Sequence, residues 1–429
     1  MIVNRNIAPP IRDIKSFNIV ESGKCLMSNG IPLFKLHSPT TEMVKIEWLF
    51  PAGNWYQELP LVAFVVNSML VEGSEKYTSS QIAETIEFYG GQIGYNVDKD
   101  NAYVSLICAE KYLPNVLEVV EDTIKNAVFP EHELESFLNK HKQQFLVEQS
   151  KVKNIARFVH SNMMFGDNHP YGYMVVENDF EKLNRDAIIR FYKQNYQSKQ
   201  CKIIVSGYIN NNVVSLIEKH FGSVDWNNSE NQFNPEFAIC PSNGNKKHIE
   251  RPDAVQSAVR IGKVMINKLH PDFVGLSVLN CILGGYFGSR LMKKIREEKG
   301  YTYGISSLLV EFRNAGYFAI VSELGADVTA PAIDDIYNEI RLLREELVPD
   351  EELIRVKNYM LGDIVRMFDG PFAQAESLIS LLEYDLGYEY YYTMVQAIKN
   401  TDSATLQMLA NKYLASESFY EVIIGRKCT

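Results

Sequence analysis

G-G-Y-F-G-S-R-L-M-K-K-I-R-E-E-K-G-Y-T-Y-G, residues 284–304, is the most informative stretch of this chain. Its charged middle predicts a helix over 290–297, and Gly300 follows as a C-terminal stop, because glycine readily adopts the left-handed backbone that ends helices. The alternating tyrosines that come next open a predicted strand. Arg296 and Tyr303 would then meet at a helix-to-strand corner. A guanidinium and a phenol hydroxyl there could donate hydrogen bonds to the carbonyl oxygens of an extended peptide. A surface arginine beside a half-buried strand tyrosine is the alternative interpretation.

The best linker candidate lies near the middle of the chain. Residues 225–247, DWNNSENQFNPEFAICPSNGNKK, are dense in Asn, Ser, Pro and Gly and interrupt any hydrophobic period. We therefore predict an N-terminal domain over 1–226, a linker over 227–247 and a C-terminal domain over 248–429.

The two predicted domains repeat each other. VAFVVNSML at 62–70 aligns with GLSVLNCIL at 275–283, and FPEHEL at 129–134 matches VPDEEL at 348–353. Each member of the second pair opens a long helix after a proline, with acidic residues in the first turn, where the helix dipole favours them. A repeat of about 200 residues indicates two homologous domains, because solenoid repeats are far shorter. Such a pair leaves a concave space in which ligand sites tend to form, although a duplicated fold without a cleft is also open.

Hydrophobic periodicity predicts the same order of elements in both halves. The predicted strands are 24–37, 44–51, 92–97, 102–109, 202–207, 254–264, 303–310 and 316–323. The predicted helices are 61–71, 80–89, 113–126, 132–148, 186–195, 211–221, 271–283, 290–297, 330–344 and 350–366.

Composition limits the partners. The chain has 429 residues, of which 46% are hydrophobic, enough for at least two cores. Its formal charge of −10 argues against nucleic acid and anionic membranes as partners. No apolar run is long enough to span a membrane, and the N-terminus lacks the pattern of a secretory signal. The six cysteines are scattered without C-x-x-C spacing. We therefore expect a soluble cytoplasmic protein.

Histidine spacing excludes a zinc pair on one helix. No two of the eight histidines lie within five residues of each other, so neither H-E-x-x-H nor H-x-x-E-H occurs. A metal site assembled from distant histidines remains open at this stage.

The stretch at 284–304 resembles the C-terminal-domain signature of the insulinase, or pitrilysin, superfamily of inverzincin metallopeptidases, which includes mitochondrial processing peptidase. Four further segments are similar to family motifs. They are AGNWYQE at 52–58, MLVEGS at 69–74, FYGGQI at 88–93 and FPEHEL at 129–134. The resemblance covers nearly the whole chain. It implies an α+β fold of two homologous domains, each a mostly antiparallel sheet with helices packed on one face, joined by the linker as half of a clam-shell.

The same resemblance places Phe64, Val65, Val66, Asn67 and Ser68 where active members carry H-x-x-E-H. In those enzymes the two histidines bind zinc and the glutamate is the general base, with a distal glutamate completing the site. Phe64, Asn67 and Ser68 replace all three groups, and Glu148 near the distal position is left unpaired. We therefore expect no catalytic residue and no metal in this chain.

The C-terminal signature departs less from the family. Its substrate-binding arginine and tyrosine fall on Arg296 and Tyr303. The resemblance thus implies the non-catalytic subunit of a two-chain peptidase, which holds extended peptide while a homologous partner supplies zinc. Self-association is the alternative to a heterodimer. The rival functions are a structural scaffold of the respiratory core-protein type and a peptidase with an unconventional metal site using Glu148 and a distant histidine such as His37.

Overall fold

The structure is a computed structural model, and it describes residues 19–227 and 235–426. Residues 1–18, on which the expectation about a signal sequence depends, lie outside the described residues, as do 228–234 of the predicted linker and 427–429, which include Cys428.

The first half is built on a six-stranded sheet, which we call the N-sheet. Its strand order is β1-β2-β6-β3-β5-β4. Only β2 and β6 run parallel, and the other neighbours are antiparallel. The strands are β1 (Gly23–Leu26), β2 (Pro32–His37), β3 (Met43–Phe50), β4 (Gln92–Val97), β5 (Ala102–Ala109) and β6 (Lys202–Gly207).

The second half repeats this arrangement in a five-stranded sheet, the C-sheet. Its strand order is β7-β11-β8-β10-β9, and again only the pair formed by β7 and β11 is parallel. The strands are β7 (Lys246–Glu250), β8 (Gln256–Met265), β9 (Thr302–Glu311), β10 (Gly316–Gly325) and β11 (Tyr420–Gly425). The two sheets have the same strand order apart from β1. In the C-sheet, β7, β11, β8, β10 and β9 take the places of β2, β6, β3, β5 and β4 in turn. The predicted α+β fold of two similar sheet-and-helix halves is confirmed.

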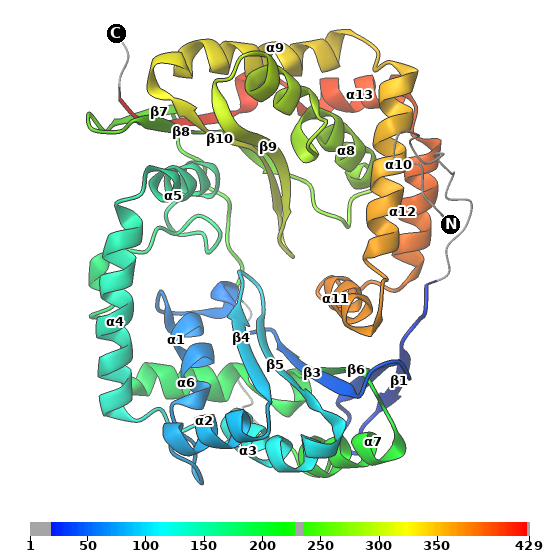
Figure 1. Ribbon diagram of the computed structural model, residues 1–429. Coiled ribbons are helices and arrows are strands. Elements are labelled where there is room, and N and C mark those ends of the chain that lie inside the picture. The colour runs from blue at the N-terminus through cyan, green and yellow to red at the C-terminus, as the bar shows by residue number, and fades with distance from the viewer. Residues whose placement is uncertain (1–18, 228–234, 427–429) are drawn as a thin grey trace, which may run out of the picture.

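Helices cover one face of each sheet with a large apolar core. Beside the N-sheet lie α1 (Val62–Ser68), α2 (Ser79–Phe88), α3 (Leu113–Lys125), α6 (Arg185–Asn195) and α7 (Asn211–Ile217). Beside the C-sheet lie α8 (Phe273–Asn280), α9 (Thr329–Glu345), α10 (Asp350–Arg366), α12 (Glu389–Asn400) and α13 (Ser403–Tyr413). Two π-helical segments flank the glycine-rich turn: η7 (Cys281–Gly285) continues α8 at the end of the helix predicted over 271–283, and η8 (Met292–Glu298) forms most of the helix predicted over 290–297. The long α4 (Glu131–Gln149) runs along one side of the molecule (Figure 1).

One helix from each half packs against the sheet of the other half. Helix α5 (Val152–Phe165) follows α4 but packs Ala156, Val159 and Met163 against the second face of the C-sheet. Reciprocally, α11 (Pro371–Leu382) follows α10 and packs against the second face of the N-sheet. Figure 1 shows α5 beneath the C-sheet and α11 beside the N-sheet. The two halves are therefore held together by exchanged helices as well as by the linker.

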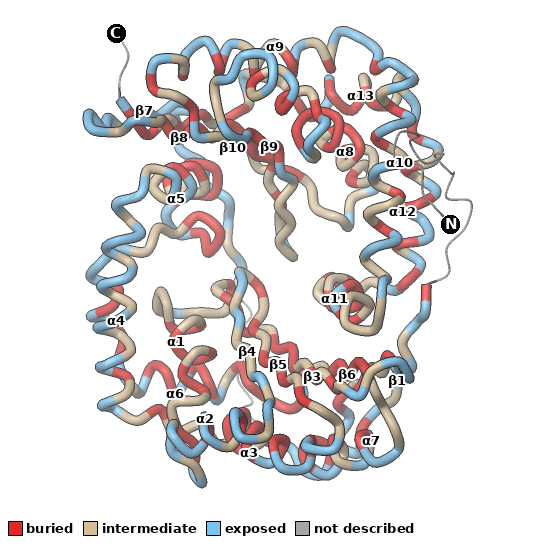
Figure 2. The backbone as a smooth tube through the Cα atoms, viewed as in Figure 1, coloured by how far each residue is buried: buried red, intermediate tan, exposed pale blue. Residues whose placement is uncertain are grey.

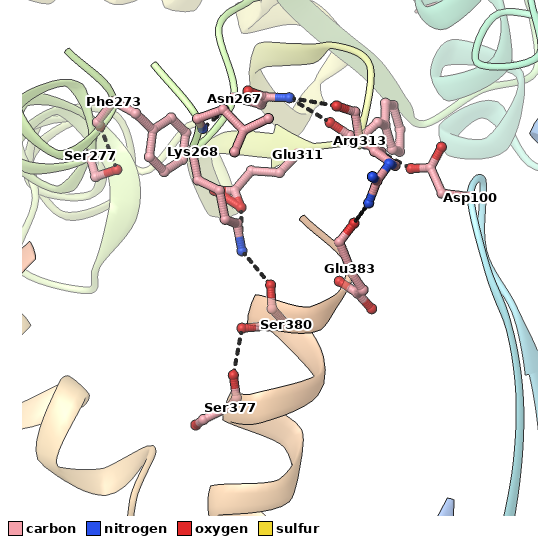
Figure 3. A network of polar contacts seen from close by, with 12 residues as sticks. Asp100, Asn267, Lys268, Phe273, Ser277, Glu311, Arg313, Ser377, Ser380 and Glu383 are labelled. Carbon is pink, nitrogen blue, oxygen red and sulfur yellow. Dashed lines mark hydrogen bonds and ion pairs between the residues drawn. The ribbon is translucent and has the colours of Figure 1, made fainter. Parts of the chain in front are cut away.

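The tip of the β9–β10 hairpin also joins the halves. The backbone N–H of Arg313 donates to Asp100 of the β4–β5 turn at 2.9 Å, and its guanidinium donates to the carbonyl oxygen of Glu383 and to Asp385. Tyr171 donates its hydroxyl to the same Asp100 carboxylate at 2.5 Å. Burial raises the pKa of Asp100 despite these hydrogen bonds. Figure 3 shows this contact between the hairpin, the β4–β5 turn and the end of α11.

Several element boundaries follow the sequence closely. Helices α4 and α10 both begin directly after a proline, as the two similar motifs predict. Gly300 has φ +67° and ends η8, so the predicted helix stop is confirmed. The predicted strand at 24–37 is wrong as one unit, because a turn with Gly30 at φ +86° divides it into β1 and β2. Among the described residues, no helix is both long and apolar enough to cross a membrane.

Candidate functional site

Arg296 lies in the π-helical segment η8, one short turn before β9. After η8, the N–H of Tyr301 donates to the carbonyl oxygen of Ile295 at 3.0 Å. The chain then enters β9, the edge strand of the C-sheet. The guanidinium carbon of Arg296 lies 4.9 Å from the ring centroid of Phe287, whose side chain is exposed. Within the described part of the chain no carboxylate pairs with this guanidinium. Its donors are therefore available to another molecule.

Tyr303 stands at a β-bulge. Thr302 pairs with Leu324 and Ile305 pairs with Ser322, so Tyr303 and Gly304 together face Glu323 alone. A bulge of this kind shifts the alternation of side chains by one residue. The Tyr303 side chain is 91% exposed and lines a cavity of about 850 Å³ between the C-sheet and the start of α5. Its hydroxyl therefore faces open space at the free edge of β9.

The structure places Arg296 and Tyr303 on adjacent elements but does not join them. Tyr303 lines the cavity, whereas Arg296 is not among the lining residues, and the described residues include no hydrogen bond between the two. A ligand that touches both side chains would have to extend beyond this cavity toward η8.

Helix α1, which carries Phe64 to Ser68, is part of the core. Val65 and Val66 are fully packed in the N-terminal core, and Figure 2 shows α1 with much of its length buried. Asn67 is 1% exposed, and its amide donates to the Tyr196 hydroxyl at 2.9 Å and to the Tyr103 carbonyl at 3.4 Å. Because both donors of this amide are used inside the protein, Asn67 works as a structural link. Ser68 is half-buried at the end of the helix.

Phe64 packs against α4. Its ring centroid lies 5.8 Å from that of Phe137 and 5.2 Å from that of His141. Phe137 and His141 are themselves 4.0 Å apart. Burial, with a smaller contribution from Lys140, lowers the pKa of His141 and so favours its neutral form. An aromatic contact therefore joins α1 and α4 at the first motif position.

Glu148 lies one residue from the C-terminal end of α4 and is exposed. Its carboxylate accepts hydrogen bonds from Lys151 and, at 2.8 Å, from Asn154. The Lys151 and Asn154 hydrogen bonds lower the pKa of Glu148. His37 ends β2, where its Nδ1 accepts the N–H of Ile209 at 3.1 Å. Over residues 19–227 and 235–426, no three His, Cys, Asp or Glu side chains are placed to hold a metal ion together.

A second cavity, of about 260 Å³, adjoins the one at Tyr303, and no local sequence pattern indicates it. Both cavities are lined by Glu323. The second one is also lined by Lys153 of α5 and Arg260 of β8, which are more than 100 residues apart in the chain. We call the two adjoining cavities together the α5 groove. Only the packing of α5 on the C-sheet brings these cations together, so periodicity within either segment could not predict the site.

Two family models match the chain. The model described as Insulinase (Peptidase family M16) matches residues 35–174, and the model described as Peptidase M16 inactive domain matches residues 182–360. The first match includes Phe64 to Ser68 and Glu148, and the second includes Arg296 and Tyr303.

Curated relatives carry peptidase names. The chain is 23% identical over 342 residues to the uncharacterized zinc protease YmxG of Bacillus subtilis, covering 79% of this chain and 82% of that protein. It is 19% identical over 369 residues to the mitochondrial-processing peptidase subunit beta of Mus musculus, covering 82% and 74% of the two chains.

Solved structures share the fold. A peptidase M16 inactive domain from Pseudomonas fluorescens superimposes with a TM-score of 0.84 at 19% identity, covering 96% of this chain and 99% of that one. A protease from Helicobacter pylori superimposes with a TM-score of 0.87 at 16% identity, covering 95% and 100%. Identities this low show likeness of fold alone.

Proposed function

Because this chain belongs to the insulinase family of peptidases, family M16, we propose that it is the non-catalytic subunit of a cytoplasmic two-chain zinc peptidase. In this proposal Arg296 and Tyr303 help to hold an extended peptide, and a homologous partner chain supplies the zinc ion and the general base. The observation that carries the proposal is a contrast between two sites. In α1, Phe64 packs against His141 and Asn67 is buried and hydrogen-bonded to Tyr196. By contrast, Tyr303 is 91% exposed beside a cavity.

The residues at the motif position do not fit a catalytic zinc ion. A phenyl ring, an amide and a hydroxyl stand at 64, 67 and 68, and zinc sites in peptidases are built from imidazole and carboxylate ligands. The Asn67 amide cannot accept a proton from water at neutral pH, so it cannot replace a general base. We therefore derive no catalytic step from this chain.

The contribution of this chain would be positioning. Strand β9 is the edge of the C-sheet, so its outer N–H and C=O groups can pair with an added peptide strand. The Tyr303 hydroxyl and the Arg296 guanidinium can each donate a hydrogen bond to a peptide carbonyl oxygen. Fixing the backbone beside a partner's metal centre would lower the entropic part of the reaction barrier.

The isolated chain tests the first part of the proposal. We expect the purified chain to contain no stoichiometric zinc by elemental analysis and to leave unstructured peptides uncut. Stoichiometric zinc together with chelator-sensitive cleavage would overturn the subunit assignment. Light scattering on the same sample distinguishes a monomer from a self-associated dimer.

The reconstituted pair tests the second part. When the chain is mixed with a co-purified, zinc-bearing homologue, Arg296→Ala and Tyr303→Phe should each lower kcat/KM about tenfold, the effect of losing about 1.4 kcal/mol of binding. The complex itself should stay intact. Arg341→Ala and Tyr392→Phe are matched controls, because both residues are exposed on helices of the second half. Unchanged turnover in the first two variants would favour the scaffold function.

A further inference from the structure

The α5 groove, next to Tyr303, has a floor formed by the second face of the C-sheet. Side chains alternate along strands, so Val259 and Ile261 enter the main core while Ala258 and Arg260 face α5. Gly304 and Ser306 of β9 and Val321 and Glu323 of β10 extend the floor to the edge strand. The groove therefore runs from Arg260 to Tyr303, and Glu323 lines it at the junction.

Helix α5 adds one cation to the lining of this groove and places a second one nearby. Lys153 lines the second cavity, and Arg157 follows one helical turn later, close enough for its charge to act on Arg260. Lys99 of the β4–β5 turn also lies within range of Arg157. None of these four cations has a carboxylate within 4.0 Å among residues 19–227 and 235–426. Lys99 donates to the carbonyl oxygen of Pro170 at 3.0 Å, and this neutral acceptor leaves its positive charge in place.

The positive charge of these groups lowers the pKa of neighbouring basic side chains. Burial and the charge of Arg157 lower the pKa of Lys99 to about 8. Burial and the charge of Arg260 lower the pKa of His160, on α5, to about 3. The pKa of Arg260 itself is lowered by burial and by Arg157. Like charges held together in a partly buried place cost free energy, and an anion bound among them would relieve that cost.

We infer that the α5 groove binds a carboxylate of the peptide, from an acidic side chain or a free C-terminus, through Arg260 with support from Arg157 and Lys153. This inference deepens the proposed function and depends on it for the peptide held at Tyr303. Arginine suits the role because its planar fork can donate two parallel hydrogen bonds to one carboxylate. The chain would thus select acidic peptides and would not bind all extended backbones equally.

Fluorescence anisotropy with the full chain and labelled peptides tests the inference. The probes are a series of extended, C-terminally amidated peptides of neutral sequence, in which a single Glu or its matched Gln is moved one position at a time. We expect one register at which Glu tightens binding about tenfold over Gln, equivalent to about 1.4 kcal/mol. A parallel series with free and amidated C-termini shows whether the preferred carboxylate comes from the side chain or from the chain end.

Variants assign the effect to the groove. Arg260→Gln should remove the preference for Glu, so that the Glu and Gln peptides bind with equal affinity at every register. Arg157→Gln, at an exposed position, should reduce the preference about threefold, and it keeps the test valid if Arg260→Gln fails to fold. Arg366→Gln, with the same change of charge on the distant α10, should preserve the preference.

The outcomes separate the two proposals. Equal binding of Glu and Gln peptides at every register would overturn the carboxylate site and leave peptide holding intact. A preference for Glu that survives Arg260→Gln and Arg157→Gln together would also overturn it. No measurable binding of any peptide would overturn this inference and, separately, remove the support for peptide holding by the isolated chain.

Discussion

Helix α1 and the α5 groove differ in what surrounds their polar groups. In α1, the Asn67 amide is buried and its hydrogen bonds end on the protein itself, while Phe64 fills the space toward α4. In the α5 groove, Tyr303 is exposed and the cations have no carboxylate partner among the described residues. Both regions belong to a duplicated fold with the same strand order. The polar groups of α1 serve packing inside the core, whereas the α5 groove keeps polar groups that packing does not need.

The largest expected effect comes from placing a carboxylate in helix α1. Asn67→Glu introduces a carboxylate where the side chain is 1% exposed and the neighbouring Tyr196 hydroxyl is fully buried. Burying a charge without an opposite partner should lower the free energy of unfolding by roughly 3–5 kcal/mol. Urea denaturation at pH 7 measures the change. Ser68→Glu, at the half-buried next position, is the control and should cost less than about 1 kcal/mol. A fully stable Asn67→Glu protein would show that α1 is an open site.

Acid should lower the free energy of unfolding through His160, which lies on α5 beside the groove. Burial disfavours the imidazolium and lowers the pKa of His160 in the folded chain to about 3, from its ordinary value of 6.5. A lowered pKa means that the stabilising contribution is complete above pH 6.5 and is lost as the pH falls toward 3. At pH 4 the loss relative to pH 7 should be roughly 3 kcal/mol.

Comparing chemical denaturation of the wild type with that of His160→Gln isolates this contribution, because other groups titrate in both proteins. The stability difference between the two proteins should narrow as the pH is lowered from 7 to 4. A constant difference would mean that His160 is protonated equally in the folded and unfolded chains.

Opening the aromatic contact should have a smaller effect. Phe64→Ala removes a half-buried ring from Phe137 and His141, and should cost roughly 2 kcal/mol of stability by urea denaturation. Because burial is the main cause of the lowered pKa of His141, the same variant should raise that pKa in an NMR titration. Tyr89→Ala, at a ring contact on the far side of the first half, should leave the His141 pKa unchanged. An unchanged His141 pKa in Phe64→Ala would contradict the packing described for α1.

The smallest effect is expected at the exposed site. Tyr303→Phe should change the free energy of unfolding by less than about 0.5 kcal/mol, because the hydroxyl at this 91% exposed side chain makes no hydrogen bond within the described residues. Asn67→Ala should cost roughly 1–3 kcal/mol of stability, because it leaves buried polar groups unpaired. Thermal denaturation of both variants compares the stability losses of the two regions. Equal losses would remove the contrast between a structural and a functional polar group.

Local sequence patterns predict most of the fold. The two proline-initiated motifs mark the starts of α4 and α10, and the stretch at 284–304 gives the helix, the glycine stop and the strand in the right order. The sequence interpretation missed α5, α11, α12, α13, β7 and β11. Helix α5 carries a readable apolar stripe of Ala156, Val159 and Met163, which the predicted element order leaves out. Even when read, the stripe could not reveal which sheet it covers.

The sequence by itself determined which side chains helix α1 carries. Side-chain type is covalent, so Phe64, Asn67 and Ser68 lack zinc-binding and basic groups whatever the fold. The tertiary structure alone decided that Arg260, from β8, and Lys153, from α5, line one cavity that adjoins the cavity at Tyr303. That meeting depends on the exchange of α5 between halves and on the bulge in β9, and both are set by long-range packing and strand register, which no local pattern of residues encodes.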